Sequence, residues 1–292
     1  MSLETPLDNE LNLLIEAALK QQYCGKCPNK KRMKEYCSYG IYPRWGAGSI
    51  NAPIMLILER PGDQPYLQEM GLELTELTRI VPQIRQLFTN IMFTSYPDGK
   101  RYLEALLEFV YGMKARRFEF SKRLKVLEKL VYITELIKCP GRLKGDLSVR
   151  NNCISNYFYR EWSLISKRKI KPQLVIIATG AINEITKRRK PEDDPNWVNN
   201  SWKVMSSLKT EVVGVDDGTT YLKVYHPSYV NRNFKNLLKK VNPQDNEEID
   251  VPCKHPDQKK AMRTKITWYL LAHLNQLVER DNLRKSILKE IS

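Results

Sequence analysis

Ionisable and sulfur-bearing side chains follow several apolar segments of this sequence, at positions where strands would end. The segment VYITELIKC, residues 131–139, has the β-branched and apolar residues of a buried strand, yet it contains Glu135 and ends at Cys139. Glu59 and His226 each follow another apolar segment. Carboxylates and imidazoles in such positions can move protons or stabilise charge during a reaction. Glu59, Glu135 and His226 are therefore the first candidates for an active site.

Four of the six cysteines have a spacing that could hold a metal. Cys24 and Cys27 form a CxxC pair; Cys139 directly follows a predicted strand, and Cys153 begins a predicted helix. Two such pairs can close around a tetrahedral zinc ion or a [4Fe–4S] cluster. The alternative is that Cys139 and Cys153 are small buried side chains, which is common for cysteine. A disulfide framework is not expected in a large cytoplasmic chain.

The charge balance is strongly basic, with 48 lysines and arginines against 33 aspartates and glutamates, a formal charge of +15. This balance favours a polyanionic partner, because each cation that meets a phosphate releases condensed counterions. A solvated basic surface without a partner is the alternative. The basic residues cluster, and Phe118 and Phe120 lie among them. The cluster comprises Lys114, Arg116, Arg117, Lys122, Arg123, Lys125 and Lys129.

Strands and helices alternate along the chain and would position these residues. The sequence predicts a parallel sheet covered on both faces, with strands at 54–59, 131–138, 173–178 and 221–225. In open α/β sheets, ligands bind beyond the carboxyl ends of the strands. Glu59, Glu135, Thr179 and His226 all fall at such ends, so a site is expected there.

The remaining pattern predicts helices and polar loops. A helix over 8–22 has Asp8 as its expected N-cap, a helical excursion over 83–130 carries the basic cluster, and a long helix forms the C-terminal part, about 257–290. His273 lies in the apolar stripe of that last helix, so it is interpreted as a packed side chain rather than a ligand. Polar loops are expected at 187–212 and 242–256.

No segment of the sequence suggests a membrane or secretory protein. The N-terminus is acidic and polar, unlike a signal peptide, and the longest apolar run is too short to cross a bilayer. We therefore expect a cytoplasmic protein.

Five motifs stand in a specific order: CGKC, RWGAGSINAPIMLILERPGD, VYITELIKC, Cys153 and YHPSYVNR. In this order they resemble the iron–sulfur branch of the uracil-DNA glycosylase superfamily, family 4 and its relatives. The resemblance covers about residues 20–62, 131–181 and 221–232. It implies a single domain over 1–292: a three-layer α/β/α sandwich with a central four-stranded parallel sheet, to which 83–130 and the C-terminal helix are additions.

The resemblance also implies a function and a cofactor. Such a protein would be a DNA glycosylase of base excision repair, which cleaves the N-glycosidic bond of a flipped base in single- or double-stranded DNA. A structural [4Fe–4S] cluster, with zinc as the alternative, would be bound by Cys24, Cys27, Cys139 and Cys153. Cys37 and Cys253 fall outside the pattern. A monomer is expected.

Individual site roles follow from the same resemblance. His226 would donate a hydrogen bond to O2 of the base, and Glu59 would orient water or balance the charge of the sugar. Tyr66 is the candidate for stacking on the base, and Glu135 stands where the family has a base-binding asparagine. Nucleic-acid contacts are expected from Ser228, Arg232 and the basic cluster.

Two departures from the family pattern indicate an altered activity. Where the family has Glu-Ala-Pro-Gly, this chain has Glu59-Arg60-Pro61-Gly62, and Arg60 cannot take a proton from water. An ionised Glu135 offers only acceptors, so it could take the N3–H of uracil but would repel O4. The resemblance implies a glycosylase whose base specificity is altered, whereas these departures by themselves support a protein without catalysis. A catalytically inactive iron–sulfur nucleic-acid-binding protein is the main alternative, and a zinc-stapled α/β protein with unrelated activity is another.

Overall fold

The computed structural model describes residues 5–20, 46–59, 81–94, 97–138, 147–187, 196–238 and 265–291. The chain separates into two compact units, each discontinuous in sequence. The first comprises Met1–Ile91 and Glu128–Val224, and the second comprises Met92–Leu127 and Tyr225–Ser292. The single domain expected over 1–292 stays a prediction. Across the described ranges, no helix is both long and apolar enough to cross a membrane.

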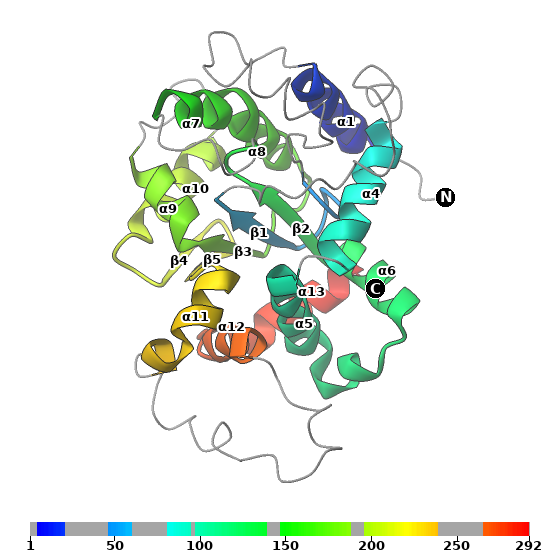
Figure 1. The fold of residues 1–292 in the computed structure, drawn as a ribbon, viewed down its shortest axis with the longest axis vertical. Coiled ribbons are helices and arrows are strands. Elements are labelled where there is room, and N and C mark those ends of the chain that lie inside the picture. Colours follow the sequence, from blue (N-terminus) through cyan, green and yellow to red (C-terminus); the bar gives the residue numbers. More distant parts are fainter. Residues whose placement is uncertain are drawn as a thin grey trace. The chain divides into compact units, whose positions relative to one another are not determined.

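The first unit is built on a sheet with the strand order β2-β1-β3-β5-β4 (Figure 1). Neighbouring strands are parallel except for β4, which is antiparallel to β5. The α/β class and the four expected parallel strands are thus confirmed. The strands are β1 Ile54–Leu58, β2 Val131–Glu135, β3 Leu174–Ala178, β4 Val213–Asp216 and β5 Thr219–Val224.

Strand β4 is an addition that the sequence prediction missed. It pairs with β5 through a two-residue turn at Asp217 and Gly218, whose φ angles are 45° and 73°. Two central residues with positive φ are typical of the type I′ hairpin, for which Asp-Gly is a preferred sequence. The signal for this hairpin was therefore present in the sequence.

The central strands are buried over their whole length. Every residue of β1, β2 and β3 is buried, on both faces of the sheet. Parallel strands buried on both faces have continuous apolar sequences, and IMLIL and LVIIA in β1 and β3 fit this rule. This explains why these strands were predictable.

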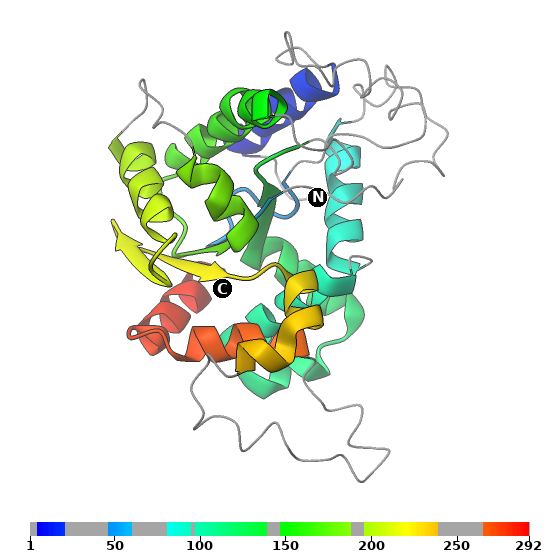
Figure 2. The same cartoon turned by 60° about the vertical axis from the view of Figure 1, so that its left-hand side comes forward.

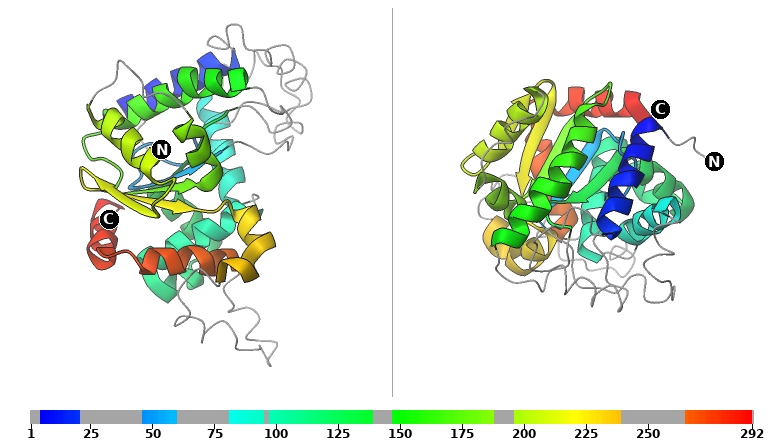
Figure 3. Two further views of the ribbon diagram at one scale, coloured as in Figure 1. Left: turned by 90° about the vertical axis from the view of Figure 1, so that its left-hand side faces the viewer. Right: turned by 90° about the horizontal axis from the view of Figure 1, so that it is seen from above.

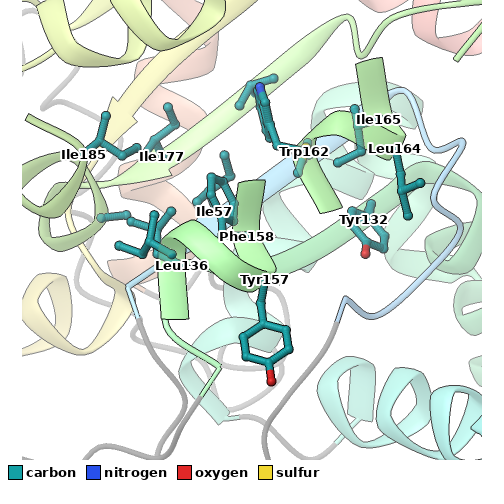
Figure 4. Close-up of a cluster of buried hydrophobic side chains, with 14 of the residues drawn as sticks. Ile57, Tyr132, Leu136, Tyr157, Phe158, Trp162, Leu164, Ile165, Ile177 and Ile185 are labelled. Carbon is teal, nitrogen blue, oxygen red and sulfur yellow. The ribbon is translucent and has the colours of Figure 1, made fainter. Parts of the chain in front are cut away.

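Helices of the first unit cover one face of the sheet, and α1 and α8 lie side by side on it (Figure 3). Their apolar side chains form one core with the strands, and Trp162 and Ile165 belong to the same cluster as Ile57 and Ile177 (Figure 4). Each large side chain buried there contributes roughly 1.5–3 kcal/mol. These helices are α1 Pro6–Leu19, α7 Leu147–Cys153, α8 Tyr159–Ser166, α9 Thr179–Thr186 and α10 Asn196–Ser207, with a π-helical turn, η3 Ile154–Phe158, between α7 and α8.

Two predictions about these helices were wrong. Thr5, not Asp8, is the N-cap of α1; Asp8 is the third helical residue, and its carboxylate accepts a hydrogen bond from the Thr5 N–H at 3.1 Å in a capping box. The expected loop over 187–212 contains α10. That helix forms because it buries Trp202 and Met205, three residues apart on one face, in the core.

The second unit is helical, and α5, α11 and α12 pack against one another (Figure 2). Its helices are α5 Pro97–Tyr111, η2 Gly112–Arg117, α11 Pro227–Leu238, α12 Lys265–Asn275 and α13 Arg280–Ile291. Two more helices, α4 Val81–Thr94 and α6 Phe120–Leu130, contribute residues to both units. The helical excursion over 83–130 is thereby confirmed in its described residues.

The long C-terminal helix was a wrong prediction, because α12 and α13 are separate helices. The chain turns between them, so that Leu277 is buried while Val278 is 98% exposed. The helix is interrupted because the described residues between Asn275 and Arg280 are not helical. In α13, Arg284 donates a hydrogen bond of 2.8 Å to the carbonyl of Val110 near the end of α5, which fixes α13 to that helix. Residues 242–256 and 257–264 lie outside the described residues.

Candidate active site

The strand order places a topological switch between β1 and β3. From β1 the chain adds β2 on one side of it and then β3 on the other. In sheets of this kind, ligands bind beyond the carboxyl ends of the strands at the switch. Glu59 directly follows β1, and Thr179 and Gly180 directly follow β3. The switch therefore carries a carboxylate and the beginning of a helix.

The Glu59 side chain lies directly against Gly180, in the first turn of α9. A Cβ atom on Gly180 would be only 2.2 Å from Glu59 Oε2, so glycine alone leaves room for the carboxylate. The first turn of a helix carries N–H groups without intrahelical partners and the positive end of the helix dipole. The Glu59 carboxylate thus lies against the positively polarised end of a helix, and its side chain is only partly buried and so can meet a ligand.

Thr179 fixes the start of α9 to the neighbouring strand. Its hydroxyl donates a hydrogen bond of 2.9 Å to the carbonyl of Val224, the last residue of β5. The beginning of α9 is therefore held between β1 and β5, and Glu59 meets a firmly placed helix end.

Glu135 is the last residue of β2 and pairs in register with Leu58. Its side chain is 5% exposed. Because Tyr132 and Thr134 both bind Glu161 of α8, strand alternation places Glu135 on the opposite face of the sheet. Glu59 contacts α9, whose apolar residues share one core with α8. The two carboxylates thus lie at the same end of adjacent strands but on opposite faces.

A buried polar network, which sequence analysis missed, joins β2 and the segment that follows it to α8. The ammonium group of Lys138 is 2.5 Å from Glu161 Oε2 and donates to Thr134 Oγ1 at 2.7 Å. Thr134 donates to the same carboxylate oxygen at 2.7 Å, and the Tyr132 hydroxyl donates to Oε1 at 2.5 Å. The side chains of Lys138 and Glu161 are 1% and 0% exposed. Burial and the charge of Glu161 raise the pKa of Tyr132 well above its usual value.

This network fixes the segment that leaves β2, because all four polar side chains satisfy one another. Lys138 immediately precedes Cys139, and Glu161 lies eight residues after Cys153. The sequence held a signal for the pair: a lysine ends an apolar segment, and an acid lies on the apolar face of the helix that begins near Cys153.

Of the expected cluster ligands, Cys153 is the one that the structure describes. It is 1% exposed, belongs to the core, and lies where α7 gives way to the π-helical turn. Such turns occur frequently at functional sites. Cys24, Cys27 and Cys139 lie outside the described residues, as do Cys37, Cys253, Arg60 and Tyr66. No group of three or more His, Cys, Asp or Glu side chains within the described ranges could hold a metal.

His226 lies in the second unit, at the start of α11. Its ring Nδ1 accepts a hydrogen bond from the Ser228 backbone N–H at 3.3 Å and lies 2.8 Å from the Ser228 hydroxyl. Since Nδ1 accepts, the neutral ring carries its proton on Nε2 and can donate from there. Pro227, the first helical residue, has no N–H that needs a partner. The sequence His-Pro-Ser thus folds into a cap that orients the imidazole.

The residues expected to contact nucleic acid differ in their exposure and in their contacts within the protein. Arg232 is exposed and bonds within its own helix to the Ser228 carbonyl at 3.2 Å. Arg116 contacts Glu108 Oε2 through Nε and Nη2, at 3.1 and 2.9 Å, and so supports the fold. Lys114, Arg117, Lys122 and Lys125 are exposed, and Arg123 is partly buried.

The family model described as the uracil DNA glycosylase superfamily matches residues 45–248. The matched range contains Glu59, Glu135 and His226 and begins after Cys24 and Cys27. A comparison with curated proteins finds no significant match.

Proposed function

Because the chain belongs to the uracil DNA glycosylase superfamily, whose members act on DNA, we propose that it is a DNA glycosylase of base excision repair with altered base specificity. The observation that carries this proposal is the Glu59 carboxylate, held against Gly180 at the switch point of the sheet. That position is where sheets of this class bind their ligands.

The reaction needs stabilisation of opposite charges. A base flipped out of the duplex leaves C1′ with the electron pair of the N-glycosidic bond, and water then adds to the cationic sugar and loses a proton. The negative charge of Glu59 would balance the sugar cation or orient that water. Its partial exposure gives a substrate access, and its contact with Gly180 limits its movement.

His226 would stabilise the departing base. The cap at Ser228 leaves Nε2–H as the donor of the neutral ring, as a hydrogen bond to O2 of a pyrimidine anion requires. Preorganised donors of this kind typically contribute a factor of about 10²–10³ in kcat. Ser228 would act as the residue that orients the imidazole.

A [4Fe–4S] cluster bound by Cys24, Cys27, Cys139 and Cys153 belongs to the same proposal, with zinc as the alternative. Thiolate donors fit either group. Support comes from the placement of Cys153 at the π-helical turn and from the rigid anchoring of Lys138, next to Cys139. The cluster would hold the surrounding segments together, because metal ligation is coupled to folding.

Metal analysis separates these alternatives. The purified protein should be brown and contain iron and acid-labile sulfide, whereas a zinc protein would be colourless. Cys153→Ser should lose iron and unfold at lower temperature, and Cys37→Ser, outside the ligand pattern, should keep its metal. Equal iron content in both variants would reject Cys153 as a ligand.

The second candidate function is a catalytically inactive iron–sulfur nucleic-acid-binding protein. Arg60 and Glu135, which replace residues of the family motifs, favour it. The deciding experiment measures excision from single- and double-stranded oligonucleotides that contain uracil, hypoxanthine or xanthine, with Glu59→Gln as the variant. Excision that Glu59→Gln abolishes without loss of DNA binding would support the glycosylase. Binding without excision of any base would favour the inactive protein.

A further inference from the structure

A small hollow lies between helices α4, α5 and α6 in the second unit. Its apolar lining comes from Phe93, Leu103, Leu124 and Leu127, and Phe120 completes it. Phe120, Leu124 and Leu127 share one face of α6 at helical spacing. Leu127 is 3% exposed and Phe120 is 63% exposed, so the apolar face opens to solvent at Phe120.

The two aromatic residues of the basic cluster have different roles. Phe118 packs edge-on against Tyr111, with ring centroids 5.3 Å apart, and the Lys122 ammonium lies 4.7 Å from the centroid of the Phe118 ring. Phe118 thus takes part in internal contacts. Phe120, two residues further on at the beginning of α6, presents a large aromatic surface to solvent. An exposed phenylalanine among cations calls for a ligand that has both apolar faces and negative charge.

The charges around the hollow complement an anion. Lys100 and Arg123 line it, and Lys122 and Lys125 are exposed on the same helix as Arg123. Glu104 also lines the hollow, but its carboxylate binds Arg101 at 2.9 Å. The acid is therefore balanced locally, while the cations around Phe120 give the surface a net positive charge.

We propose that this surface binds single-stranded DNA, with Phe120 stacking on an unpaired base and Lys100 and Arg123 contacting the neighbouring phosphates. Aromatic rings set in a positively charged groove are the general means of binding single strands. A base within a duplex has both faces covered by its neighbours, so an exposed ring can stack only on an unpaired one. The inference rests on the proposed function only in taking DNA as the partner.

Binding of a labelled, unmodified oligothymidine of about 12 nucleotides tests the proposal, since single-strand sites span about 4–16 nucleotides. Phe120→Ala should weaken binding about tenfold, and Phe120→Tyr, which keeps the ring, should bind within about twofold of wild type. An abasic strand of equal length offers no base for stacking, so it should bind wild type and Phe120→Ala with equal affinity. Arg123→Gln should reduce the salt slope by about 0.7, the value for one phosphate contact in a single strand, whereas Phe120→Ala should leave the slope unchanged.

Controls separate stacking from other effects. Ile170→Ala removes another exposed apolar residue, 55% exposed in the first unit, and should leave affinity unchanged. Unfolding temperatures of all variants should match wild type. Two results would overturn the proposal and favour a protein partner for the hollow. Phe120→Ala could bind oligothymidine as tightly as wild type does, or it could lose as much affinity for the abasic strand as for oligothymidine. Because the strand holds no modified base, absence of excision activity would leave this measurement unaffected.

Discussion

The carboxylate of Glu59 occupies the space that any side chain at Gly180 would need. The 2.2 Å between Oε2 and a Cβ atom at position 180 is far below a van der Waals contact, so Gly180→Ala must displace the carboxylate. The contact also joins two segments more than a hundred residues apart, the end of β1 and the start of α9. It therefore sets the geometry of the candidate active site.

A double-mutant cycle tests this contact. Gly180→Ala should destabilise the wild-type protein by up to about 1 kcal/mol, because the carboxylate at the end of the flexible Glu59 side chain must rotate away from the added methyl group. In a Glu59→Ala background the same change should be neutral or stabilising by about 0.5–1 kcal/mol, because alanine is the better helix former. Urea unfolding measures both values. An equal loss in the two backgrounds would mean that Gly180 is needed for another reason.

Lys138→Met should be strongly destabilising. It leaves the Glu161 carboxylate buried without its cation, which typically costs about 3–5 kcal/mol. The double variant Lys138→Met with Glu161→Leu should recover much of that loss, because an apolar pair can replace a buried ion pair. Free energies of unfolding from urea titration provide the measurement.

The exposed ion pair of Lys167 and Glu10 is the matched control. Its side chains are 54% and 43% exposed, and the N–O distance is 2.6 Å. Lys167→Met should change stability by less than about 1 kcal/mol. If Lys138→Met were equally mild, the network would not anchor the segment before Cys139.

Local sequence patterns predicted the strands of this fold but not the contacts between distant residues. Four strands were predictable because continuous apolar runs such as IMLIL need only local information. The pairing of Lys138 with Glu161 depends on how α8 lies on the sheet, and its partners are 23 residues apart. Glu59 was predictable as a strand-end acid, but its contact with Gly180 required β1 and β3 to be neighbours. Local patterns contain no such information.

The helices illustrate the same limit. The apolar stripe through His273 was correctly interpreted as a packed face, but the turn before Val278 was missed because the spacing of apolar residues continues across it. The segment of α10 was predicted as a loop because polar residues surround the two buried residues, Trp202 and Met205. Tertiary packing decides both cases.

His273 should make the protein less stable in mild acid. It lies edge-on to Tyr269, with ring centroids 4.6 Å apart, and burial lowers its pKa from 6.5 to about 4. Between these values the unfolded chain binds a proton that the folded chain does not, so stability falls as pH decreases from about 6.5 to about 4. The loss attributable to this group is up to about 3 kcal/mol.

Comparison with His273→Phe isolates this effect, because the variant keeps an aromatic ring but cannot titrate. Urea unfolding across this pH range should give a flatter profile for the variant than for wild type. Parallel profiles would show that His273 takes up its proton equally well in the folded protein.

Glu135→Asn should give the protein uracil excision, or increase it. An amide offers one donor for O4 and one acceptor for N3–H, whereas an ionised carboxylate has no donor for O4. One good bidentate contact is worth about 1–3 kcal/mol, so the rate on uracil should rise roughly tenfold or more. Conversely, wild type should prefer an edge with two adjacent donors, such as N1–H and N2–H₂ of a guanine-type base. Single-turnover excision from strands that contain either base measures both effects.

Glu135→Gln controls for charge alone, since it carries the same amide on a longer side chain. If it gains as much uracil excision as Glu135→Asn, removal of the negative charge rather than base recognition explains the gain. If wild type and Glu135→Asn both bind DNA but leave every base intact, Glu135 does not set specificity and the inactive binding protein is the better description. Because Glu135 is only 5% exposed, a substitution there can change stability as well as base contact. Both variants should therefore first match wild type in unfolding temperature. With folding matched, a gain confined to the asparagine variant can come only from contact with the base edge.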